Sequence, residues 1–443
     1  MRTLLLLLLG LSACGPSASP APEPPPTASP PALSTPPSTP PSTPPSPEPR
    51  VLPRPAPPVP RPSPGPRPDI LVVVLDTTSP GAVDAAMPQA RAFAEGGRRY
   101  TRAWSSSNST MEAVAGVFVG AWMSAARLWE ADLVTLPETL KEAGYSTYFG
   151  SANIVLDHPF YARGADVAEA RAQDLRRDFP DLGAVERFEQ SWATLEGPRF
   201  GWLQLAACHD YRVAGKDYIG QGPPRGEAAL KEAHAAYLLD CAATDALLPR
   251  VFAANPGGLT ILTADHGELF GHLGSYPLRG QAEHGHGLGS SPLELHIPLA
   301  LQGPGVVPGV DDRPASLLEV RSTVLQAAGL DDGRGDLRSG RLAWPPVAAA
   351  CHLNDGGPGD MTALLQPDGS QLLRTAQYGM PELVRWEPAG VGLKDDWSAV
   401  DPAGITPDQR RLLFDAARLL CVSDEDLCRQ HPELVALGYI DCP

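Results

Sequence analysis

Proline is distributed very unevenly along this chain of 443 residues, and its distribution limits where a domain can form. Residues 15–68 hold 25 of the 51 prolines, whereas the other 26 are spread over the 375 residues that follow. A stretch so poor in apolar side chains cannot offset its loss of conformational entropy by burying surface, so we expect it to stay extended or disordered. The later residues suffice for one large α/β domain or two smaller ones. The sequence therefore excludes a fully globular chain, a coiled coil and a small disulfide scaffold.

The N-terminus predicts an export signal. Arg2 precedes a short apolar run, Leu4–Leu9 and then Leu11, which is far below the ~20 residues of a membrane span. The run ends in Leu-Ser-Ala-Cys at Leu11–Cys14, which resembles the lipobox of bacterial lipoproteins. That resemblance implies cleavage before Cys14 and lipidation of this cysteine, and several acyl chains on one residue form a stable membrane anchor. An ordinary secretory peptide with an incidental cysteine is the alternative.

The proline-rich segment is predicted to be a tether between the lipid anchor and the folded part of the chain. Ser-Thr-Pro-Pro occurs three times in succession over residues 34–45. Polyproline II rises ~3.1 Å per residue, so a stiff segment of this length reaches on the order of 150 Å. We expect a signal peptide at 1–13, a lipidated Cys14 with a disordered linker at 14–68, and a lipid-anchored protein of the bacterial cell envelope, on the outer membrane or facing the periplasm.

The part after the tether is strongly acidic. The first 68 residues carry a net charge of +3 and the whole chain −16, so residues 69–443 carry −19. Nucleic-acid binding relies on Lys and Arg to neutralise phosphates, so we expect no nucleic-acid partner. An anionic substrate would need a local site or a bound cation.

Six cysteines remain after the lipobox. An even number in an exported chain suggests up to three disulfides, but 15 complete pairings exist and the sequence does not choose among them. We expect most of these cysteines to be oxidised. A redox active site is not expected because no C-x-x-C is present.

Strand and helix signals alternate from Asp69 onward. Ile70–Leu75 is a run of six apolar residues, which indicates a central strand of a parallel sheet covered on both faces. Thr135 opens a capping-box pattern for a helix that Gly144 would stop. Other strands are expected at 145–149, 200–205, 259–263 and 297–301, and other helices at 111–123 and 230–251. The alternation predicts an α/β fold, with a parallel or mixed sheet sandwiched by helices.

Two of the predicted strands end in residues that suit a metal. Asp76 follows the first strand, where open α/β sheets place their ligands, although a turn or cap residue is the alternative. Asp265 and His266 follow another, and Gly267 allows the turn that lets both face one site. Histidine with carboxylates suits zinc, manganese or iron better than calcium alone. Five of the ten histidines lie within 31 residues: His266, His272, His284, His286 and His296.

A third element is the polar run Ser105–Thr110 before the helix-compatible stretch at 111–123. A hydroxyl at a helix N-terminus lies in the positive end of the dipole, where an anion binds well. A plain N-cap needs the same residue types and is the alternative. Beside a metal, such a hydroxyl can become a nucleophile.

The order of these elements resembles the sulfatase/alkaline phosphatase superfamily over roughly residues 69–330. The matching segments are Ile70–Thr77 ("ILVVVLDT"), Thr135–Phe149 ("TLpetLkeaGYsT"), Leu262–Glu268 ("taDHGE"), His284–Gly287 with Ile297–Leu299 ("HG…VPL"), and Leu434–Tyr439 ("LxxLGY"). The resemblance implies an alkaline-phosphatase-like fold: a mixed, mostly parallel sheet sandwiched by helices, with a smaller C-terminal subdomain over 331–443.

The resemblance also implies a metal site and a substrate site. One divalent cation, Mn, Zn or Ca, would be held by Asp76, Thr110, Asp265 and His266. The anionic oxygens of an ester substrate, or its leaving group, would be contacted by His209, His284 and His286. His286 is in addition the candidate general acid.

The nucleophile of the superfamily lies ten residues before a glycine that ends a helical turn, and counting back from Gly120 reaches Thr110. Sulfatases carry Cys, occasionally Ser, in a Cys-x-Pro-Ser-Arg pattern, and neither that cysteine nor the arginine is present. Threonine is what phosphoester-cleaving or phosphoglycerol-transferring members use. The implied chemistry is attack by the Thr110 alkoxide, a covalent phosphothreonine, and its release by water or an alcohol.

Some positions depart from the pattern of the superfamily. Thr77 stands where many sulfatases have a second aspartate, Ser79 and Gly81 replace an arginine and an aspartate, and Glu112–Val114 replaces small polar and basic residues. Three functions therefore remain: a metal-dependent phosphate-ester hydrolase or transferase, a sulfuric ester hydrolase, and a surface binding lipoprotein that has lost catalysis.

Overall fold

The computed structural model describes residues 67–123, 133–169, 179–206, 208–209, 226–270, 284–286 and 292–343, together with the backbone of strands within 212–217 and 347–400. The predicted signal peptide, Cys14, the proline-rich linker as far as residue 66 and the "LxxLGY" segment lie outside the described residues.

Strand β1 (Ile70–Leu75) lies at the centre of the main sheet. It pairs in parallel with β5 (Arg199–Leu205) and with β8 (Leu259–Thr263). All six of its side chains are buried. Because both faces of the strand are covered, its sequence is continuously apolar, which confirms the predicted central strand.

The main sheet is mixed and mostly parallel, as expected. Its order is β12–β2–β11–β8–β1–β5–β3–β4, and β13 also pairs with β2. Strand β11 runs antiparallel to both of its neighbours, while the other pairs are parallel. The bounds of the strands not yet given are β2 (Arg98–Trp104), β3 (Ser146–Ser151), β4 (Val167–Glu169), β11 (His296–Gln302), β12 (Gly309–Asp311) and β13 (Ala315–Ser316).

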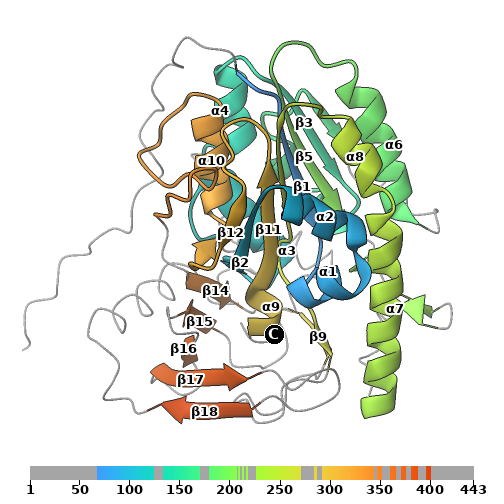
Figure 1. Cartoon of the computed structure of the whole chain (residues 1–443), viewed down its shortest axis with the longest axis vertical. Coiled ribbons are helices and arrows are strands. Elements are labelled where there is room, and N and C mark those ends of the chain that lie inside the picture. The colour runs from blue at the N-terminus through green and yellow to red at the C-terminus, as the bar shows by residue number, and fades with distance from the viewer. Residues whose placement is uncertain are drawn as a thin grey trace, which may run out of the picture. The chain divides into compact units, whose positions relative to one another are not determined.

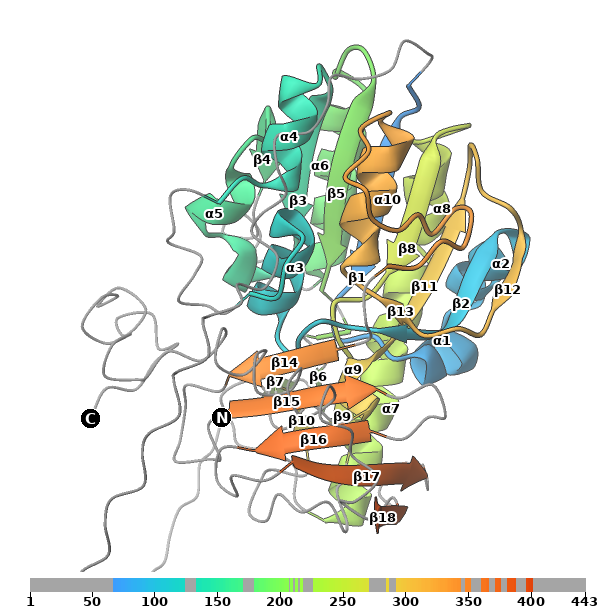
Figure 2. The ribbon, with the colours of Figure 1, turned by 90° about the vertical axis from the view of Figure 1, so that its left-hand side faces the viewer.

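Helices cover both faces of this sheet (Figures 1 and 2). One face packs against α3 (Thr110–Val119), α4 (Leu136–Glu142) and α10 (Glu319–Ala327). The other packs against α1 (Pro80–Ala86), α2 (Pro88–Gly96), α6 (Pro180–Trp192), α7 (Glu227–Asp245) and α8 (Leu248–Ala253). Alternate residues of β1 enter the two cores, and each large apolar side chain buried in this way contributes about 1.5–3 kcal/mol.

The helix ends follow the local sequence signals. Thr135 and Glu138 form the expected capping box of α4, and Gly144 has the left-handed φ of +85°. Gly120 ends α3 at φ +72°, where an added Cβ would lie 2.5 Å from Arg321 Cδ. The helix expected at 230–251 is two helices, α7 and α8, because Pro249 lacks the N–H that a continuous helix needs.

Shorter elements complete the described chain. They are η2 (Ile154–Leu156), α5 (Pro159–Ala162), α9 (Pro292–Leu295), the pair β9 (Leu269–Phe270) and β10 (His284–Gly285), and the pair β6 (Arg212–Val213) and β7 (Lys216–Asp217). A separate antiparallel sheet comprises β14 (Val347–Cys351), β15 (Asp360–Leu365), β16 (Gln371–Thr375), β17 (Pro381–Glu387) and β18 (Asp396–Val400). None of the helices in the described part combines the length and the apolar character that crossing a bilayer requires.

Candidate active site and metal centre

Two strand ends bring the predicted ligands together. Asp76 follows β1 and Asp265 follows β8, and these neighbouring parallel strands end at the same edge of the sheet. Asp76, Asp265 and His266 are at most 1% exposed, and each offers one ligand atom within 4.8 Å of the others. At Gly267 the chain passes so close to helix α9 that an added Cβ would lie 2.1 Å from the Leu293 carbonyl oxygen. Only glycine fits there, so the turn after His266 depends on it.

Hydrogen bonds fix the orientation of both carboxylates. Asp265 Oδ1 accepts from the backbone N–H of His266 at 2.8 Å and of Thr77 at 3.1 Å. Gln204 Nε2 donates to Asp265 Oδ2 at 2.9 Å and to Asp76 Oδ2 at 3.2 Å. Asn153 Nδ2 donates to the same Asp76 oxygen at 2.5 Å. Donors behind both carboxylates are what a preorganised metal site requires.

His266 presents one ring nitrogen to the carboxylates. Its Nδ1 lies 2.9 Å from the Gly267 carbonyl oxygen, which can only accept, so Nδ1 carries the proton and Nε2 has a free lone pair. Nε2 lies 3.9 Å from Asp76 Oδ1 and 3.8 Å from Asp265 Oδ2. The imidazole is therefore in the tautomer that ligates a metal through Nε2.

Thr110 is the first residue of α3 and its side chain reaches this cluster. Its Oγ1 lies 3.1 Å from His266 Nε2 and 3.4 Å from Asp76 Oδ1, and the residue is 4% exposed. Ser109, the N-cap residue, makes no side-chain cap hydrogen bond. The hydroxyl thus lies at the positive end of a ten-residue helix, where negative charge is stabilised.

The electrostatics of the cluster fit a cation. Burial, and then the charge of Asp265, raise the pKa of Asp76 to about 7. Burial lowers the pKa of His266 to about 4, so the ring is neutral. Two carboxylates and a neutral imidazole, buried side by side, leave negative charge that a divalent ion would neutralise. The donor set of carboxylate oxygen, imidazole nitrogen and hydroxyl suits zinc or manganese.

His286 and His209 lie beside the cluster. The ring of His286 is centred 4.4 Å from that of His266 and 5.1 Å from that of His209. His286 Nδ1 lies 3.1 Å from Glu268 Oε2, and Glu268 is 6% exposed. Burial by itself would lower the pKa of His286, but the Glu268 carboxylate more than offsets this, so the net shift is upward. The Glu268 carboxylate thus favours the protonated form of the His286 ring beside His266.

Other residues singled out in the sequence have different surroundings. His296 begins β11 and contacts β2: its Nε2 lies 2.9 Å from the Thr101 carbonyl oxygen and its ring lies against Trp104. His284 is part of β10 in backbone only, and its side chain lies outside the described residues, as does all of His272. Ala113 and Val114, which depart from the superfamily pattern, face the core beneath α3.

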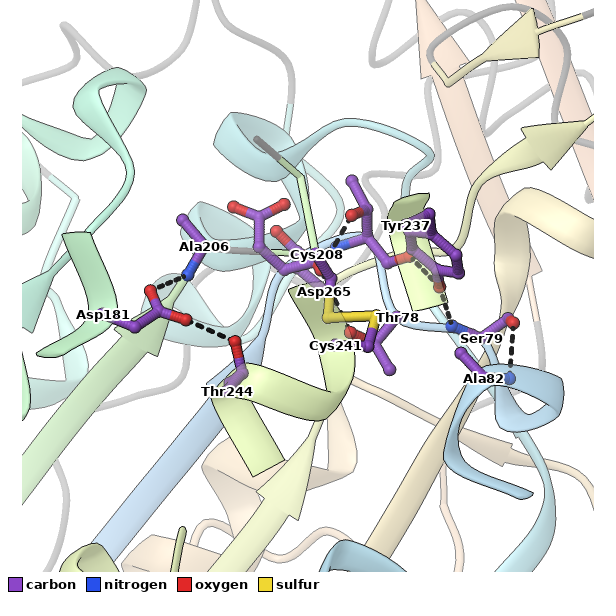
Figure 3. The surroundings of a disulfide bond; sticks show 12 residues. Thr78, Ser79, Ala82, Asp181, Ala206, Cys208, Tyr237, Cys241, Thr244 and Asp265 are labelled. Carbon is purple, nitrogen blue, oxygen red and sulfur yellow. Dashed lines mark hydrogen bonds between the residues drawn. A yellow bond between two sulfur atoms is a disulfide. The ribbon is translucent and has the colours of Figure 1, made fainter. Parts of the chain in front are cut away.

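The cysteines are partly described. Cys208 and Cys241 form a disulfide that joins the loop after β5, which carries His209, to α7 (Figure 3). Cys351 is described as backbone in β14, and Cys421, Cys428 and Cys442 lie outside the described residues.

Sequence reasoning did not assign Gln204, Asn153 or Glu268 to the site. A signal for Gln204 existed: it is a polar residue in an otherwise apolar strand, and it is fully buried. Burying an unpaired amide costs about 1–3 kcal/mol, so a polar residue near the end of such a strand indicates a partner in the site. Asn153 similarly follows β3 by two residues.

Comparison with known protein families identifies the family of this chain. The family profile described as Sulfatase matches residues 68–330, more than half of the chain. The chain belongs to the sulfatase family. The match contains every candidate ligand described above. No curated protein matches the chain in sequence.

Solved structures of the alkaline phosphatase/sulfatase superfamily share the fold of this sulfatase-family chain. They include the phosphonate monoester hydrolase of Agrobacterium radiobacter (TM-score 0.55, 14% identity, covering 72% of this chain and 89% of that one). A protein in the alkaline phosphatase superfamily from Vibrio parahaemolyticus has a TM-score of 0.54 and 15% identity, and the match covers 88% of this chain and 94% of that one. A 2-O GAG sulfatase has a TM-score of 0.55 and 14% identity, and the match covers 85% of this chain and 95% of that one. The predicted fold and superfamily are confirmed.

Proposed function

We propose that the chain is a metal-dependent hydrolase or transferase of phosphate esters, with Thr110 as its nucleophile. The observation that carries this is the position of Thr110 Oγ1, which lies 3.1 Å from His266 Nε2 and 3.4 Å from Asp76 Oδ1 at the start of α3. The fold is compatible with this activity, since the chain shares it with a phosphonate monoester hydrolase.

Asp76, Thr110, Asp265 and His266 would hold one divalent cation, zinc or manganese by the chemistry of the donors. When bound, the cation supplies Lewis acidity that lowers the pKa of the Thr110 hydroxyl and neutralises an anionic ester. Before attack, the Thr110 hydroxyl donates to Asp76 Oδ1, 3.4 Å away, and this contact orients Oγ1.

In the first step the Thr110 hydroxyl passes its proton to Asp76 Oδ1, and Oγ1 attacks phosphorus while the bond from phosphorus to the leaving alcohol oxygen breaks. The product is a phosphothreonine, and His286 gives a proton to the departing alkoxide. In the second step neutral His286 takes a proton from water, or from an alcohol in a transferase. That oxygen displaces Thr110, whose Oγ1 takes its proton back from Asp76. Glu268 stabilises the charged form of His286 throughout.

The side chain at position 110 favours phosphate over sulfate. The cysteine that sulfatases of this superfamily carry there is replaced by a threonine hydroxyl, which forms a phosphate ester directly. A sulfuric ester hydrolase is the second candidate, because the chain matches the Sulfatase profile and shares its fold with a 2-O GAG sulfatase.

The test uses the full chain in detergent with Mn²⁺ or Zn²⁺, assayed on an aryl phosphate, a phosphodiester and an aryl sulfate. We expect turnover of a phosphorus ester, and a loss of at least about 10³-fold in kcat/KM for Thr110→Ala. Thr110→Ser, which keeps the hydroxyl, is the matched control and should stay within about tenfold of wild type.

Each alternative has its own outcome in this assay. Equal rates for wild type and Thr110→Ala would refute the assignment of Thr110 as the nucleophile. Faster turnover of the sulfate would favour the sulfuric ester hydrolase. A bound metal without turnover of any ester would favour the surface binding lipoprotein.

Location completes the proposal. The lipobox at Leu11–Cys14 and the proline-rich segment support a lipid-anchored enzyme whose tether holds residues 69–443 away from the membrane of the cell envelope. Metabolic labelling with palmitate, compared between wild type and Cys14→Ala, tests the anchor.

A further inference from the structure

Thr77, the residue after Asp76, has an unusual backbone. Its φ is +53°, and within the described ranges it is the one non-glycine residue with a positive φ. A β-branched side chain in this region is a genuine outlier, because Cβ crowds the backbone. Such a conformation persists only where its surroundings hold it, so the contacts of Thr77 indicate what it is for.

The twisted peptide of Thr77 connects the carboxylates to α7. Its N–H donates to Asp265 Oδ1 at 3.1 Å, and its carbonyl oxygen accepts from the Tyr237 hydroxyl at 3.0 Å. Its own Oγ1 donates to the Asp76 carbonyl oxygen at 2.8 Å. One residue therefore lies between both candidate carboxylate ligands and a phenol.

Tyr237 is suited to hold that residue. It is 1% exposed, and its hydroxyl donates to the Thr77 carbonyl oxygen. The same hydroxyl accepts a hydrogen bond from the Ser79 backbone N–H at 3.2 Å (Figure 3). Burial raises its pKa well above the ordinary tyrosine value, so the phenol stays a donor. The phenol thus clamps both ends of the turn Thr77–Ser79 to α7.

Helix α7 is itself firmly attached near Tyr237. One turn further along, Cys241 forms the disulfide with Cys208. Thr244 Oγ1 donates to Asp181 Oδ2 at 2.6 Å, and Asp181 Oδ1 accepts from Ala206 N–H at 2.7 Å (Figure 3). The phenol is therefore presented from a fixed support, which a clamp requires.

The geometry points to Tyr237 as a positioning residue for the metal carboxylates, one that holds Thr77 in the left-handed conformation that aims its N–H at Asp265. This inference rests on the proposed function, in which Asp76 and Asp265 bind a divalent cation. Without the phenol, Thr77 relaxes toward negative φ, Asp265 loses a donor, and the two carboxylates no longer share one orientation.

The test measures metal binding rather than turnover. The full chain is stripped of metal and titrated with Mn²⁺, and free Mn²⁺ is followed by electron paramagnetic resonance. Tyr237→Phe should bind Mn²⁺ at least tenfold more weakly than wild type, with an unchanged far-UV circular dichroism spectrum. The matched control is Tyr148→Phe, because Tyr148 is equally buried at 1% and donates to Glu169 at 2.9 Å, away from the site. Its affinity should equal that of wild type.

A second substitution separates positioning from a merely structural role. Glycine adopts positive φ without strain, so Thr77→Gly no longer needs the clamp. Thr77→Gly alone should bind Mn²⁺ within about threefold of wild type. Added to Tyr237→Phe, it should restore most of the lost affinity, which general destabilisation would not do.

The outcomes are distinct. Wild-type affinity in Tyr237→Phe, or no recovery in the double variant, would overturn the inference and leave the proposed function intact. Absence of Mn²⁺ and Zn²⁺ binding by wild type would overturn both. If Tyr237→Phe does not fold, the Mn²⁺ affinity of Thr77→Gly is the deciding measurement. A loss of affinity above tenfold would show that the side chain of Thr77, not its backbone, serves the site.

Discussion

Asp311, the last residue of β12, is a carboxylate that stabilises the edge of the sheet through ion pairs. Its side chain is 6% exposed and lies 2.7 Å from Arg98 Nη2 and 2.6 Å from Arg313 Nη2. Hydrogen bonds from Arg313, and then from Arg98, hold the pKa of Asp311 below the usual range of a carboxyl group. Because Arg98 belongs to β2, this ion pair attaches the edge strand to its neighbour.

We predict that this attachment weakens in acid. A carboxyl whose folded pKa is depressed contributes its full stability above its unfolded pKa, about 3.9, and loses it as pH falls toward the folded pKa. Asp311→Asn should lower the free energy of unfolding by about 2 kcal/mol at pH 7, with a smaller difference toward pH 3. Urea unfolding across this pH range checks it, with the exposed neighbour Asp312→Asn as control. A difference that does not vary with pH would contradict the prediction.

At the site, the residues of the candidate metal cluster were predictable, and most of those behind them were not. Asp76, Asp265 and His266 follow apolar strands, so the sequence places them at the edge where ligands bind. Tyr237 is inside a helix, and nothing local separates it from a core residue, whereas Gln204 has only the weak signal of one amide in an apolar strand. Their roles depend on tertiary contacts between segments far apart in the chain.

Among the elements, strands with strong local signals were predicted and weak ones were missed. β1, β5, β8 and β11 are apolar runs that the structure confirms within one or two residues. β2 has the sequence Arg-Arg-Tyr-Thr-Arg-Ala-Trp, and only three of its seven residues are buried, so it lacks both an apolar run and regular alternation. It forms because β11, β12 and β13 supply partners, which no local pattern reveals.

The Cys208–Cys241 disulfide joins two elements that both contribute to the site. It closes a loop of 33 residues, which predicts a stabilisation of about 3–4 kcal/mol by restricting the unfolded chain. The double variant Cys208→Ser/Cys241→Ser should lose about that much in guanidinium unfolding. Its KM for a phosphate ester should rise, because the loop that carries His209 is released.

Thiol counting provides the control for this prediction. Unreduced wild type should leave Cys208 and Cys241 unreactive to alkylation before unfolding and also after it. If both residues are alkylated in unfolded, unreduced protein, the disulfide is absent and the prediction fails.

At the scale of the whole molecule, charge opposes the proposed substrate. Residues 69–443 carry −19, so an anionic ester is repelled at long range, and salt screens this repulsion. Raising KCl from about 20 to about 200 mM should increase kcat/KM about two- to threefold for a dianionic phosphate monoester. The increase should be smaller for a monoanionic diester, which serves as the internal control. A fall in kcat/KM with salt would instead indicate a positively charged entrance.

The place of β1 in the sheet has a consequence for how the chain acquires its structure. Ile70 pairs with Phe200 on one side and with Leu259 on the other. Both edges of this strand therefore stay unpaired until segments much later in the chain have been synthesised. A six-residue apolar strand with open edges is prone to pair with other chains, and non-local pairing is slow. A nascent chain that ends before β8 exposes one edge of β1, so we expect it to be prone to aggregation until residue 263 has been synthesised.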